Sequence, residues 1–440
     1  NIDGTADNSF STDGVVTTDF GDWDEATSIA IQSDGKILVA GSAFNGSTFE
    51  FAIVRYNSDG TLDNSFGTAG KVTTDMGFGD DYGQAIAVQS DGKIVVSGGT
   101  DAASGTGDFA VVRYNANGVT DGSFGSGGVV ITDFGTANAI SYGLGIQSDG
   151  KIVLSGAVID GSGSDFVTVR YNTDGTLDMT FSVDGIVETA VGADIDIARA
   201  TLIQDDGKIL AVGFLVNGVD ADVAMVRYNA DGTLDTSFDQ DGKAIYDSGA
   251  GDEGAYGATL QGDGKILVVG SQDGGLEPDF LLLRYDTDGT LDSTFGSNGI
   301  VTTDFGSYAE ARDVNIDPNG KIVVVGTVTD GGNDEFAVAR YISGINIGVA
   351  DQLIKTNSVL VYPNPVQDAS VLEYTLIKDQ KLSIELFDVA GRSFGNILPK
   401  TERTVGTHKE SLNLQGIPSG NYILMIQSAS GSLGIKILKQ

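Results

Sequence analysis

The side chains able to do chemistry in this 440-residue chain are almost all carboxylates. There are 61 Asp and Glu residues, no Cys and a single His, His408, near the C-terminal end. Most of the chain therefore has no imidazole base, no thiol nucleophile and no His or Cys metal ligand, so any catalysis there would use carboxylates, Tyr, Ser, Thr, Lys or Arg. The absence of Cys fits a cytosolic protein and equally an exported one built without disulfide bonds.

One recurrent acidic segment, NxDGTLDxSF, has the composition of a cation site. Oxygen atoms of Asn57, Asp59 and Asp63 around Gly60 would suit Ca²⁺, a hard cation that takes roughly six to eight oxygen ligands. The pattern recurs at Asn172, Asp174 and Asp178, and at Asn229, Asp231 and Asp235. The spacing is not that of an EF-hand, and Asx residues followed by Gly also form ordinary turns. The segment is predicted to be a turn, with calcium as the alternative.

The charge of the chain is unevenly distributed. Residues 1–355 carry 17 of the 25 basic and 54 of the 61 acidic side chains, whereas residues 356–440 are nearly neutral. Two modules with different electrostatics therefore meet near residue 350. The first should repel nucleic acid and anionic membranes and attract cations or basic partners, which argues against nucleic-acid binding. No apolar run approaches the roughly 20 residues of a membrane-spanning helix, so no transmembrane segment is predicted.

The first module is built from six sequence repeats. The triplet Asp-Gly-Lys begins at Asp34, Asp91, Asp149, Asp206 and Asp263, with Asn-Gly-Lys at Asn319. Arg-Tyr pairs recur with the same spacing, from Arg55–Tyr56 to Arg340–Tyr341. Each unit is predicted to form four short strands, in the first unit one ending at 32 and others at 36–41, 49–56 and 71–75, with a hairpin turn at Asp34–Gly35. Four strands per repeat predict the blades of an all-β, six-bladed propeller over residues 1–341.

The two ends of this module are complementary half-repeats. Residues 1–10 (NIDGTADNSF) match residues 57–66 (NSDGTLDNSF), and the last repeat stops after Tyr341 without its own copy. We therefore expect residues 14–19 (GVVTTD) to supply the fourth strand of the final blade and close the ring. An open solenoid is the alternative.

The repeated text DGKILVAG, FAIVRYN and DGTLDNSFG resembles the bacterial delta-60 repeat family, over residues 1 to about 341. This resemblance implies secreted or surface proteins and brings no defined activity and no catalytic residues.

Function is expected on the end of the blades where the links vary, here called the variable face. It carries the links from second to third strands and from fourth to first strands, whereas the Asp-Gly-Lys turns and NxDGTLDxSF links of the opposite end hardly change. The fourth-to-first links hold aromatic residues beside acidic stretches: Trp23, Tyr82, Tyr142, Tyr256 and Tyr308. These residues would stack on a sugar or peptide. In the alternative interpretation they only cover the tops of the blades.

The arginines of the Arg-Tyr pairs are interpreted as structural. The alternation in FEFAIVRY places Arg55 on the same side as Phe49, Phe51 and Ile53, which favours a blade-to-blade ion pair with an aspartate of the long link over an anion site.

Residues 342–358 are predicted to be a linker, and residues 359–440 a small Ig-like β-sandwich of about seven short strands. Four segments of this module stand out: Tyr362-Pro363-Asn364-Pro365, LFDVAGR with Asp388 and Gly391, IPSGNY with Gly420 and Tyr422, and the terminal KILKQ with Lys436 and Lys439. Together they resemble the type A C-terminal sorting domain of the type IX secretion system.

This second resemblance implies export from bacteria of the Bacteroidota, with the secretion translocon and a sortase as partners of the domain. The first module would reach the outside or the outer surface after transit through the periplasm. His408 would then be a strand residue of the signal, neither catalyst nor metal ligand.

Together these observations predict a secreted binding or adhesion propeller that binds a glycan or protein ligand on the variable face. A structural surface-layer or matrix protein is the main alternative. A glycan hydrolase or lyase that uses two carboxylates is less favoured, because no pair of carboxylates stands out among the many.

Overall fold

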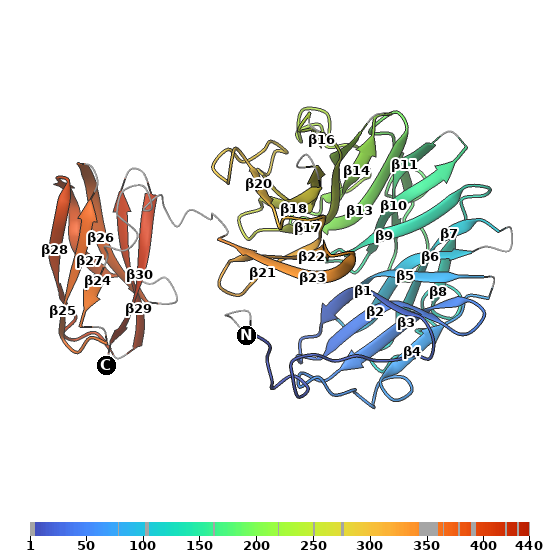
Figure 1. Cartoon of the computed structure of the whole chain (residues 1–440), viewed down its shortest axis with the longest axis horizontal. Helices are drawn as coiled ribbons and strands as arrows, with labels where there is room; N and C mark the ends of the chain where they lie inside the picture. The colour runs from blue at the N-terminus through green and yellow to red at the C-terminus, as the bar shows by residue number, and fades with distance from the viewer. Residues whose placement is uncertain are drawn as a thin grey trace. The chain divides into compact units, whose positions relative to one another are not determined.

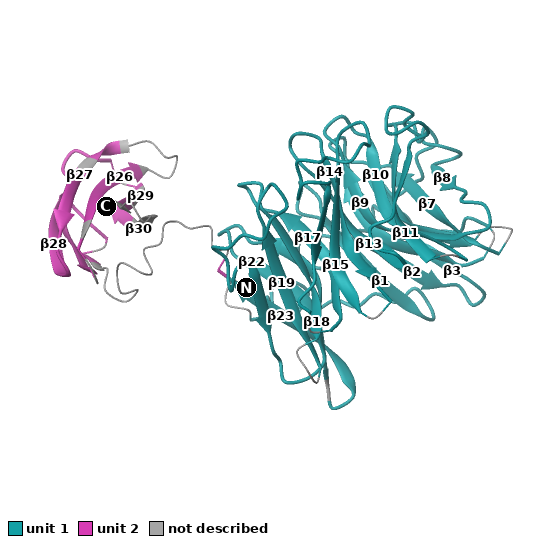
Figure 2. Ribbon diagram, turned by 90° about the horizontal axis from the view of Figure 1, so that it is seen from above, with its two compact units in different colours: residues 1–341 teal, residues 342–440 magenta. Residues whose placement is uncertain are grey.

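The chain folds into two compact units, Asn1–Tyr341 and Ile342–Gln440, each described by itself (Figure 2). The computed structural model describes all residues except 1–4, 78, 102–104, 162, 219, 250, 274–276, 343–359, 364, 377–378, 389–392, 419, 429–430 and 440. The predicted linker 342–358 therefore lies, apart from Ile342, outside the described residues. No described helix is long and apolar enough to cross a membrane.

The first unit consists of repeated antiparallel sheets whose strands follow one another in chain order, as propeller blades do (Figure 1). One parallel bridge, between Ser164 of the third sheet and Ile195 of the fourth, joins these two sheets into one of eight strands. The strands are β1 (Asp24–Ile31), β2 (Ile37–Phe44), β3 (Phe49–Tyr56), β4 (Lys71–Thr74), β5 (Asp81–Val88), β6 (Ile94–Asp101), β7 (Gly107–Tyr114), β8 (Val129–Thr132), β9 (Asn138–Ile146), β10 (Ile152–Asp160), β11 (Gly163–Tyr171), β12 (Ile186–Thr189), β13 (Ile195–Ile203), β14 (Ile209–Val216), β15 (Ala221–Tyr228), β16 (Lys243–Tyr246), β17 (Glu253–Leu260), β18 (Ile266–Asp273), β19 (Pro278–Tyr285), β20 (Ile300–Thr303), β21 (Ala309–Ile316), β22 (Ile322–Asp330) and β23 (Asn333–Tyr341). The four predicted strands are thus confirmed in the first five repeats, and the sixth has three.

The core of this unit lies between consecutive sheets. Five apolar clusters fill the five junctions, and the second and third strands contribute to the clusters on both sides. Strands covered on both faces are apolar along most of their length, which is why polar and apolar residues do not alternate in KILVAG and FAIV. The first strands of neighbouring sheets also contact one another in sequence, from β1 and β5 through to β17 and β21.

The predicted closing strand is not formed in the described structure. The last sheet has three strands, β21, β22 and β23, and residues 14–19 belong to no strand. On β23 the side chains of Phe336 and Val338 are 99% and 65% exposed, whereas Phe280 and Leu282, at the matching places of β19, are 1% exposed. The apolar face that a fourth strand and a neighbouring sheet cover elsewhere is open here.

The N-terminal segment instead packs against the first sheet in the manner of a preceding repeat. The Thr18 hydroxyl lies 2.5 Å from the Tyr56 hydroxyl, as Thr74 lies 2.7 Å from Tyr114 one repeat later. The Ser11 amide donates to the Asp59 carbonyl at 2.7 Å, a further contact that recurs between consecutive repeats. Half of the predicted arrangement is therefore present, and the half that involves β23 is not.

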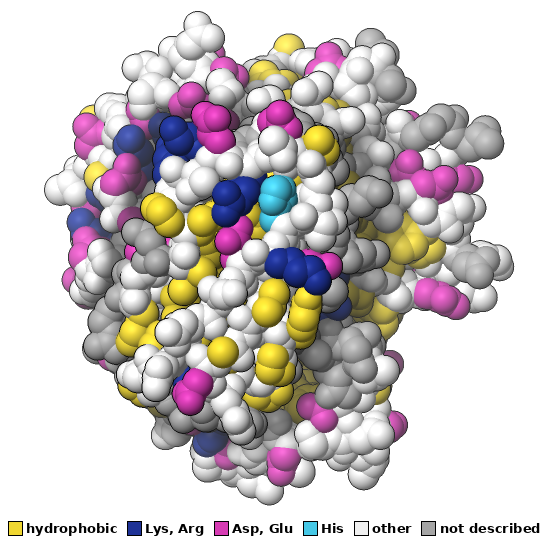
Figure 3. Space-filling model, turned by 90° about the vertical axis from the view of Figure 1, so that its left-hand side faces the viewer, with side chains coloured by type: hydrophobic (Ala, Val, Ile, Leu, Met, Phe, Trp, Pro, Cys, Tyr) yellow, Lys and Arg dark blue, Asp and Glu magenta, His cyan; other side chains and the backbone are white. Residues whose placement is uncertain are grey.

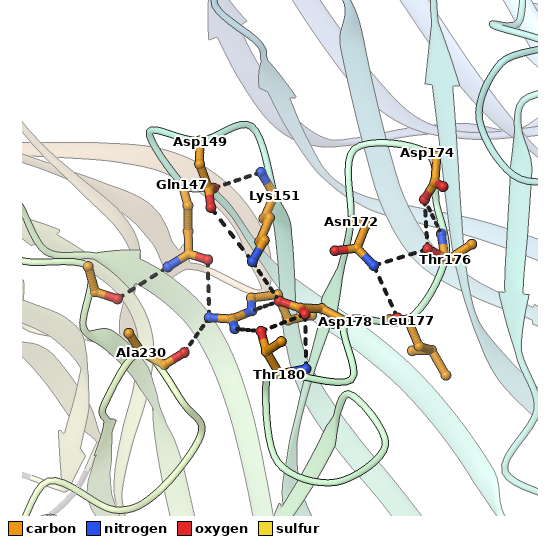
Figure 4. Close-up of polar contacts among 12 residues, drawn as sticks. Gln147, Asp149, Lys151, Asn172, Asp174, Thr176, Leu177, Asp178, Thr180 and Ala230 are labelled. Atoms are coloured by element: carbon orange, nitrogen blue, oxygen red, sulfur yellow. Dashed lines mark hydrogen bonds and ion pairs between the residues drawn. The ribbon is translucent and has the colours of Figure 1, made fainter.

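At four junctions a buried arginine joins one repeat to the next. Figure 4 shows the polar contacts around Asp178 in the third repeat. In the third repeat, the Arg170 Nε donates to Asp178 Oδ2 at 2.7 Å within the same repeat. One terminal nitrogen of the guanidinium donates to the Ala230 carbonyl of the next repeat at 2.7 Å. The group also lies over the Phe181 ring, 4.7 Å from its centroid. The expected blade-to-blade ion pair is therefore wrong in one respect: the aspartate belongs to the same blade, and a carbonyl receives the bond that crosses the junction.

The Arg–Asp pair recurs at five repeats, at 55–63, 113–121, 170–178, 227–235 and 284–292. The bond to a carbonyl of the next repeat recurs from Arg55, Arg113 and Arg227. Burial alone would raise the pKa of Asp178, but hydrogen bonds from Thr180 and Lys151 and the charge of Arg170 hold it well below its usual range. The ionised pair is thus the stable form at any ordinary pH.

The second unit is formed by two antiparallel sheets, β24-β25-β28 and β27-β26-β29-β30. Its strands are β24 (Leu360–Tyr362), β25 (Ala369–Leu376), β26 (Gln380–Asp388), β27 (Ser393–Arg403), β28 (Gly406–Asn413), β29 (Gly420–Ser428) and β30 (Gly431–Lys439). Buried side chains of both sheets, such as Leu372, Ile384 and Leu424, belong to one apolar cluster.

We predict that Asp178→Asn lowers the free energy of unfolding by about 3 kcal/mol, because it leaves the buried Arg170 guanidinium without its counter-charge. The measurement is urea denaturation at pH 7. Asp174→Asn is the matched control, since among the described residues this exposed carboxylate accepts only from the Thr176 of its own turn, and Asn forms the same turn.

The difference between the parent and Asp178→Asn should also depend on pH in one direction. The pKa of Asp178 is lowered in the folded state, so its stabilising contribution is complete above the unfolded pKa of about 3.9 and is lost as the pH falls below it. Equal stabilities at pH 7, or a difference that grows in acid, would contradict the assigned role.

Candidate functional site

The nine residues of the calcium hypothesis lie in turns and ion pairs at the repeated end of the sheets. In the first link, Asp59 Oδ1 accepts hydrogen bonds from the amide and hydroxyl of Thr61, and Asn57 turns its Nδ2 to the Thr61 hydroxyl at 3.0 Å. Asp63 is buried and bonded to Lys36 and Arg55. Residues 172, 174 and 178 and residues 229, 231 and 235 repeat this arrangement. The turn interpretation describes this geometry, and calcium at these links stays a prediction.

The five aromatic residues predicted on the variable face do not all lie in links. Trp23 and Tyr308 directly precede β1 and β21 and are 69% and 40% exposed. Tyr82, Tyr142 and Tyr256 lie inside β5, β9 and β17, so their assignment to links was wrong. The prediction failed because these first strands begin with polar and Gly-rich sequences, which are typical of loops.

Trp23 belongs to an aromatic group at the first junction. Its ring is 6.4 Å from that of Phe49, which lies 5.4 Å from the ring of Tyr82. A surface pocket of about 610 Å³ is lined by Trp23 and residues 17–19, 22 and 24. This part of the variable face offers an exposed ring with carboxylates around it.

Tyr142 and Tyr256 share a special backbone position. Each is the extra residue of a β-bulge between the first and second strand of its sheet. A bulge occurs at this place in all six sheets, where the extra residues are Thr27, Gln84, Tyr142, Arg199, Tyr256 and Arg312. A bulge residue is left out of the ladder and its side chain is re-aimed, which is why bulges are common beside binding sites. We call these six residues the bulge set.

The bulge set places arginines against aromatic rings. The Arg199 guanidinium carbon is 4.1 Å from the centroid of Tyr142 and 5.7 Å from that of Phe214. The Arg312 guanidinium carbon is 5.0 Å from the centroid of Tyr256, and Arg312 forms an ion pair of 2.5 Å with the buried Glu310. Burial, together with hydrogen bonding and charge from Glu310, raises the pKa of Tyr256 to about 12, so its hydroxyl stays protonated at neutral pH.

Arg199 is only partly buried and differs from the buried arginines in having no ion-pair partner among the described residues. Among the described residues it forms no ion pair, and its Nε is buried without a hydrogen-bond partner. In a chain with a net charge of −36, a guanidinium that faces rings and no carboxylate is unusual.

Sequence reasoning missed Arg199 and Arg312, although a signal was present. Gln204 and Asp317 are the last residues before the hairpin turns of their repeats, and each arginine lies five residues before them. The position of the arginines carries different residue types in the other repeats. When the six repeats are aligned, the bulge set is a position at which the residue type varies.

The predicted sorting residues lie in the second unit. Tyr422 is buried in β29, which begins at Gly420, and donates to the Pro418 carbonyl at 2.8 Å. Lys439 is buried at the end of β30, 3.4 Å from Asp368. Pro363 and Pro365 follow β24; Asp388 ends β26 and Lys436 lies in β30, and the side chains of these last two are outside the described residues, as are Asn364 and Gly391.

His408 is a member of β28, and its ring stacks on Tyr374 with centroids 5.4 Å apart. A ring nitrogen lies 2.7 Å from the Thr404 carbonyl. Figure 3 views the side of the molecule where basic side chains and the histidine reach the surface. These contacts give the ring a structural place in the sheet.

Two family models match the chain. The model described as a domain of unknown function (DUF5122) β-propeller matches residues 32–66, 89–124, 147–181, 204–238, 261–295 and 318–342. The model described as a secretion system C-terminal sorting domain matches residues 360–440. The chain therefore belongs to the proteins that combine DUF5122 β-propeller repeats with a type IX secretion sorting domain. It is exported by that system and is secreted or attached at the outer surface.

No curated protein matches the chain. Among solved structures, a polysaccharide lyase of family PL25, an ulvan lyase, is 12% identical with a TM-score of 0.41 and covers 75% of this chain and 81% of its own. Hydrazine synthase of Kuenenia stuttgartiensis is 11% identical, with a TM-score of 0.36, and covers 91% and 67%. Fructan 1-exohydrolase IIa from Cichorium intybus is 7% identical, with a TM-score of 0.31, and covers 96% and 91%. Similarity at this level does not identify a function.

We predict that a chain ending at residue 345, expressed in a Bacteroidota host with an active type IX system, stays in the periplasm, because the address read by the translocon has been removed. Pulse-chase labelling with separate assay of medium and cells measures this. Secretion of the truncated chain at the rate of the full chain would contradict the sorting role.

Proposed function

We propose that the first unit is a secreted binding module whose ligand sits on the variable face, over the bulge set. The observation that carries this proposal is the Arg199 guanidinium, which is held against the Tyr142 ring and has no carboxylate partner among the described residues. Protein interiors pair buried charges, so a partly buried cation without a partner is costly to keep and is expected where a ligand completes it.

The ligand class follows from the chemistry of these side chains. A planar guanidinium binds carboxylate or sulfate oxygens through paired hydrogen bonds, and Tyr and Trp faces stack on sugar rings. We therefore propose a glycan that carries carboxylate or sulfate groups, such as a uronic-acid polymer, and assign no catalytic residue. Trp23, Tyr82 and Tyr308 would extend the contact outward, and the many surrounding carboxylates would reject polyanions that cannot reach Arg199.

We predict that Arg199→Gln weakens binding of an acidic glycan by about 10- to 100-fold, the loss of one or two charge-assisted hydrogen bonds. The ligand is first found on a glycan array with the full chain, and affinity is then measured by calorimetry. Lys321→Gln is the control, because it removes the same charge from the repeated end of the sheets.

Two results would overturn this proposal. One is an array on which no glycan binds, which would favour a structural surface-layer or matrix protein. The other is a bound glycan whose affinity is unchanged in Arg199→Gln and in Trp23→Ala.

We further propose that the mature fold is a closed six-bladed ring followed by an Ig-like β-sandwich. The register of β3 with β4 pairs Ala52 with Thr73, and by repeat equivalence Ala337 would pair with Thr17. This pairing would cover Phe336 and Val338 and would bring Asp7 beside Arg340, the place that Asp63 takes beside Arg55. The N-terminal segment already contacts the first sheet as a preceding repeat would.

We predict that a chain carrying Thr17→Cys and Ala337→Cys forms an intramolecular disulfide on mild oxidation, because paired strands bring Cα atoms within about 4.4–6.8 Å. The natural chain has no Cys, so free thiols counted by mass spectrometry report this bond alone. Asp13→Cys with Ala337→Cys is the out-of-register control. Free thiols in both variants, or disulfides only between two chains, would contradict closure.

A further inference from the structure

A group of three carboxylates lies at the junction of the fourth and fifth sheets. Asp222 is the second residue of β15, Asp247 follows β16, and Glu253 begins β17. One oxygen from each lies within 4.8 Å of the others. Asp222 and Glu253 are 3% and 0% exposed, whereas Asp247 is exposed. The group therefore has two buried members and one that faces solvent.

The described contacts of these carboxylates leave one buried oxygen without a partner. Asp222 Oδ2 accepts from Asn217 Nδ2 at 2.9 Å, but Asp222 Oδ1 is buried and accepts no hydrogen bond. Glu253 accepts from the hydroxyl and amide of Ser248. None of the three forms an ion pair with a Lys or Arg among the described residues.

The electrostatics of the group are unfavourable without a cation. Burial raises the pKa of Asp222, and the charges of Asp247 and Asp220 raise it further. Burial also raises the pKa of Glu253, and the charges of Asp222 and Asp247 add to this against the hydrogen bonds from Ser248. Buried carboxylates that repel one another are stabilised by a shared positive ion.

The other junctions show that this group is not a general feature of the repeat. The three equivalent positions are Asp108, Asp133 and Ala139 at the second junction, Asp165, Ala190 and Asp196 at the third, and Asp279, Asp304 and Ala309 at the fifth, so each has lost one carboxylate to Ala. At the first junction all three, Glu50, Asp75 and Asp81, are acidic, and Glu50 accepts from Asn45 Nδ2 as Asp222 accepts from Asn217 Nδ2, but their oxygens do not all lie within 4.8 Å of one another. Among the described residues, only the fourth junction brings all three carboxylates together.

We propose that Asp222, Asp247 and Glu253 bind one hard divalent cation of the Ca²⁺ type. Oxygen ligands on opposite sides of a Ca²⁺ ion, each at about 2.4 Å, are about 4.8 Å apart, so carboxylates with this spacing can share one ion. Asp247 gives the ion access from solvent, and water completes its shell. The ion would tie the end of β16 to the start of β17 across the junction, beside Tyr256 of the bulge set.

The test is calorimetric titration of the full chain with CaCl₂, followed by competition with MgCl₂. We expect one ion per chain and a loss of at least about 10-fold in affinity for Asp247→Asn, because one of three charged ligands is removed. Asp133→Asn is the matched control: Asp133 Oδ1 accepts from the Gly135 amide at 2.6 Å, as Asp247 Oδ1 accepts from Gly249 at 2.6 Å, but it has no such group around it. Because Asp247 is exposed, its replacement should leave the fold intact. Asp222→Asn adds a test at a buried ligand, with circular dichroism to verify folding.

Saturable binding that Asp247→Asn weakens and Asp133→Asn leaves unchanged supports the site. The proposal is overturned by the absence of saturable binding at millimolar Ca²⁺ and Mg²⁺, or by equal affinity in Asp247→Asn. It is also overturned by several ions per chain whose binding Asp59→Asn weakens, since these would belong to the repeated link. The titration contains no glycan, so its outcome is independent of the proposed function.

Discussion

The architecture of the first unit depends on a buried arginine that, at four junctions, reaches across from one sheet to the next. Its guanidinium bonds to an aspartate of its own repeat and lies over a phenylalanine eleven residues further along the chain, as Arg170 lies over Phe181. The same group donates to a carbonyl of the next repeat. A guanidinium can do this because its fork of donors is planar and always charged. Each repeat therefore needs both its own long link and that of the next repeat.

This constraint explains why one end of the sheets is uniform and the other is not. The Asp-Gly-Lys turns and the NxDGTLDxSF links hold the arginine and its aspartate, so a change there leaves a buried charge without a partner. Residues of the variable face do not hold this arginine and its aspartate, so they can change without leaving that charge unpaired. The bulges in the first strands recur because the backbone of every sheet is the same, but their side chains project out of the ladder and can differ. Tyr142, Arg199, Tyr256 and Arg312 illustrate a repeated backbone position with unrepeated chemistry.

Much of the fold could be predicted from the sequence, because the same strand pattern occurs in each of the six repeats. The strands of the first repeat, such as β3 at Phe49–Tyr56, agree with those expected from their apolar sequences. Closure of the ring could not be settled in this way. Matching half-repeats show that residues 14–19 could pair with β23, but they do not show that this pairing forms. Arg199 and Arg312 were missed, and Tyr142 and Tyr256 were assigned to links, for a related reason: a bulge is a property of the pairing between strands, which the sequence of one strand does not show. The carboxylates at the fourth junction are 25 and 6 residues apart in the chain, so only the packing of two sheets brings them together.

The central claim is that repeated positions carry stability whereas the bulge set carries function. Thermal unfolding of a variant with Tyr142, Arg199, Tyr256 and Arg312 all replaced by Thr, the residue found at position 27, tests this claim most directly. The account predicts a melting temperature that falls less than in the single variant Asp178→Asn, despite four substitutions against one. A larger fall than in Asp178→Asn would contradict it, because the bulge residues would then be part of the scaffold.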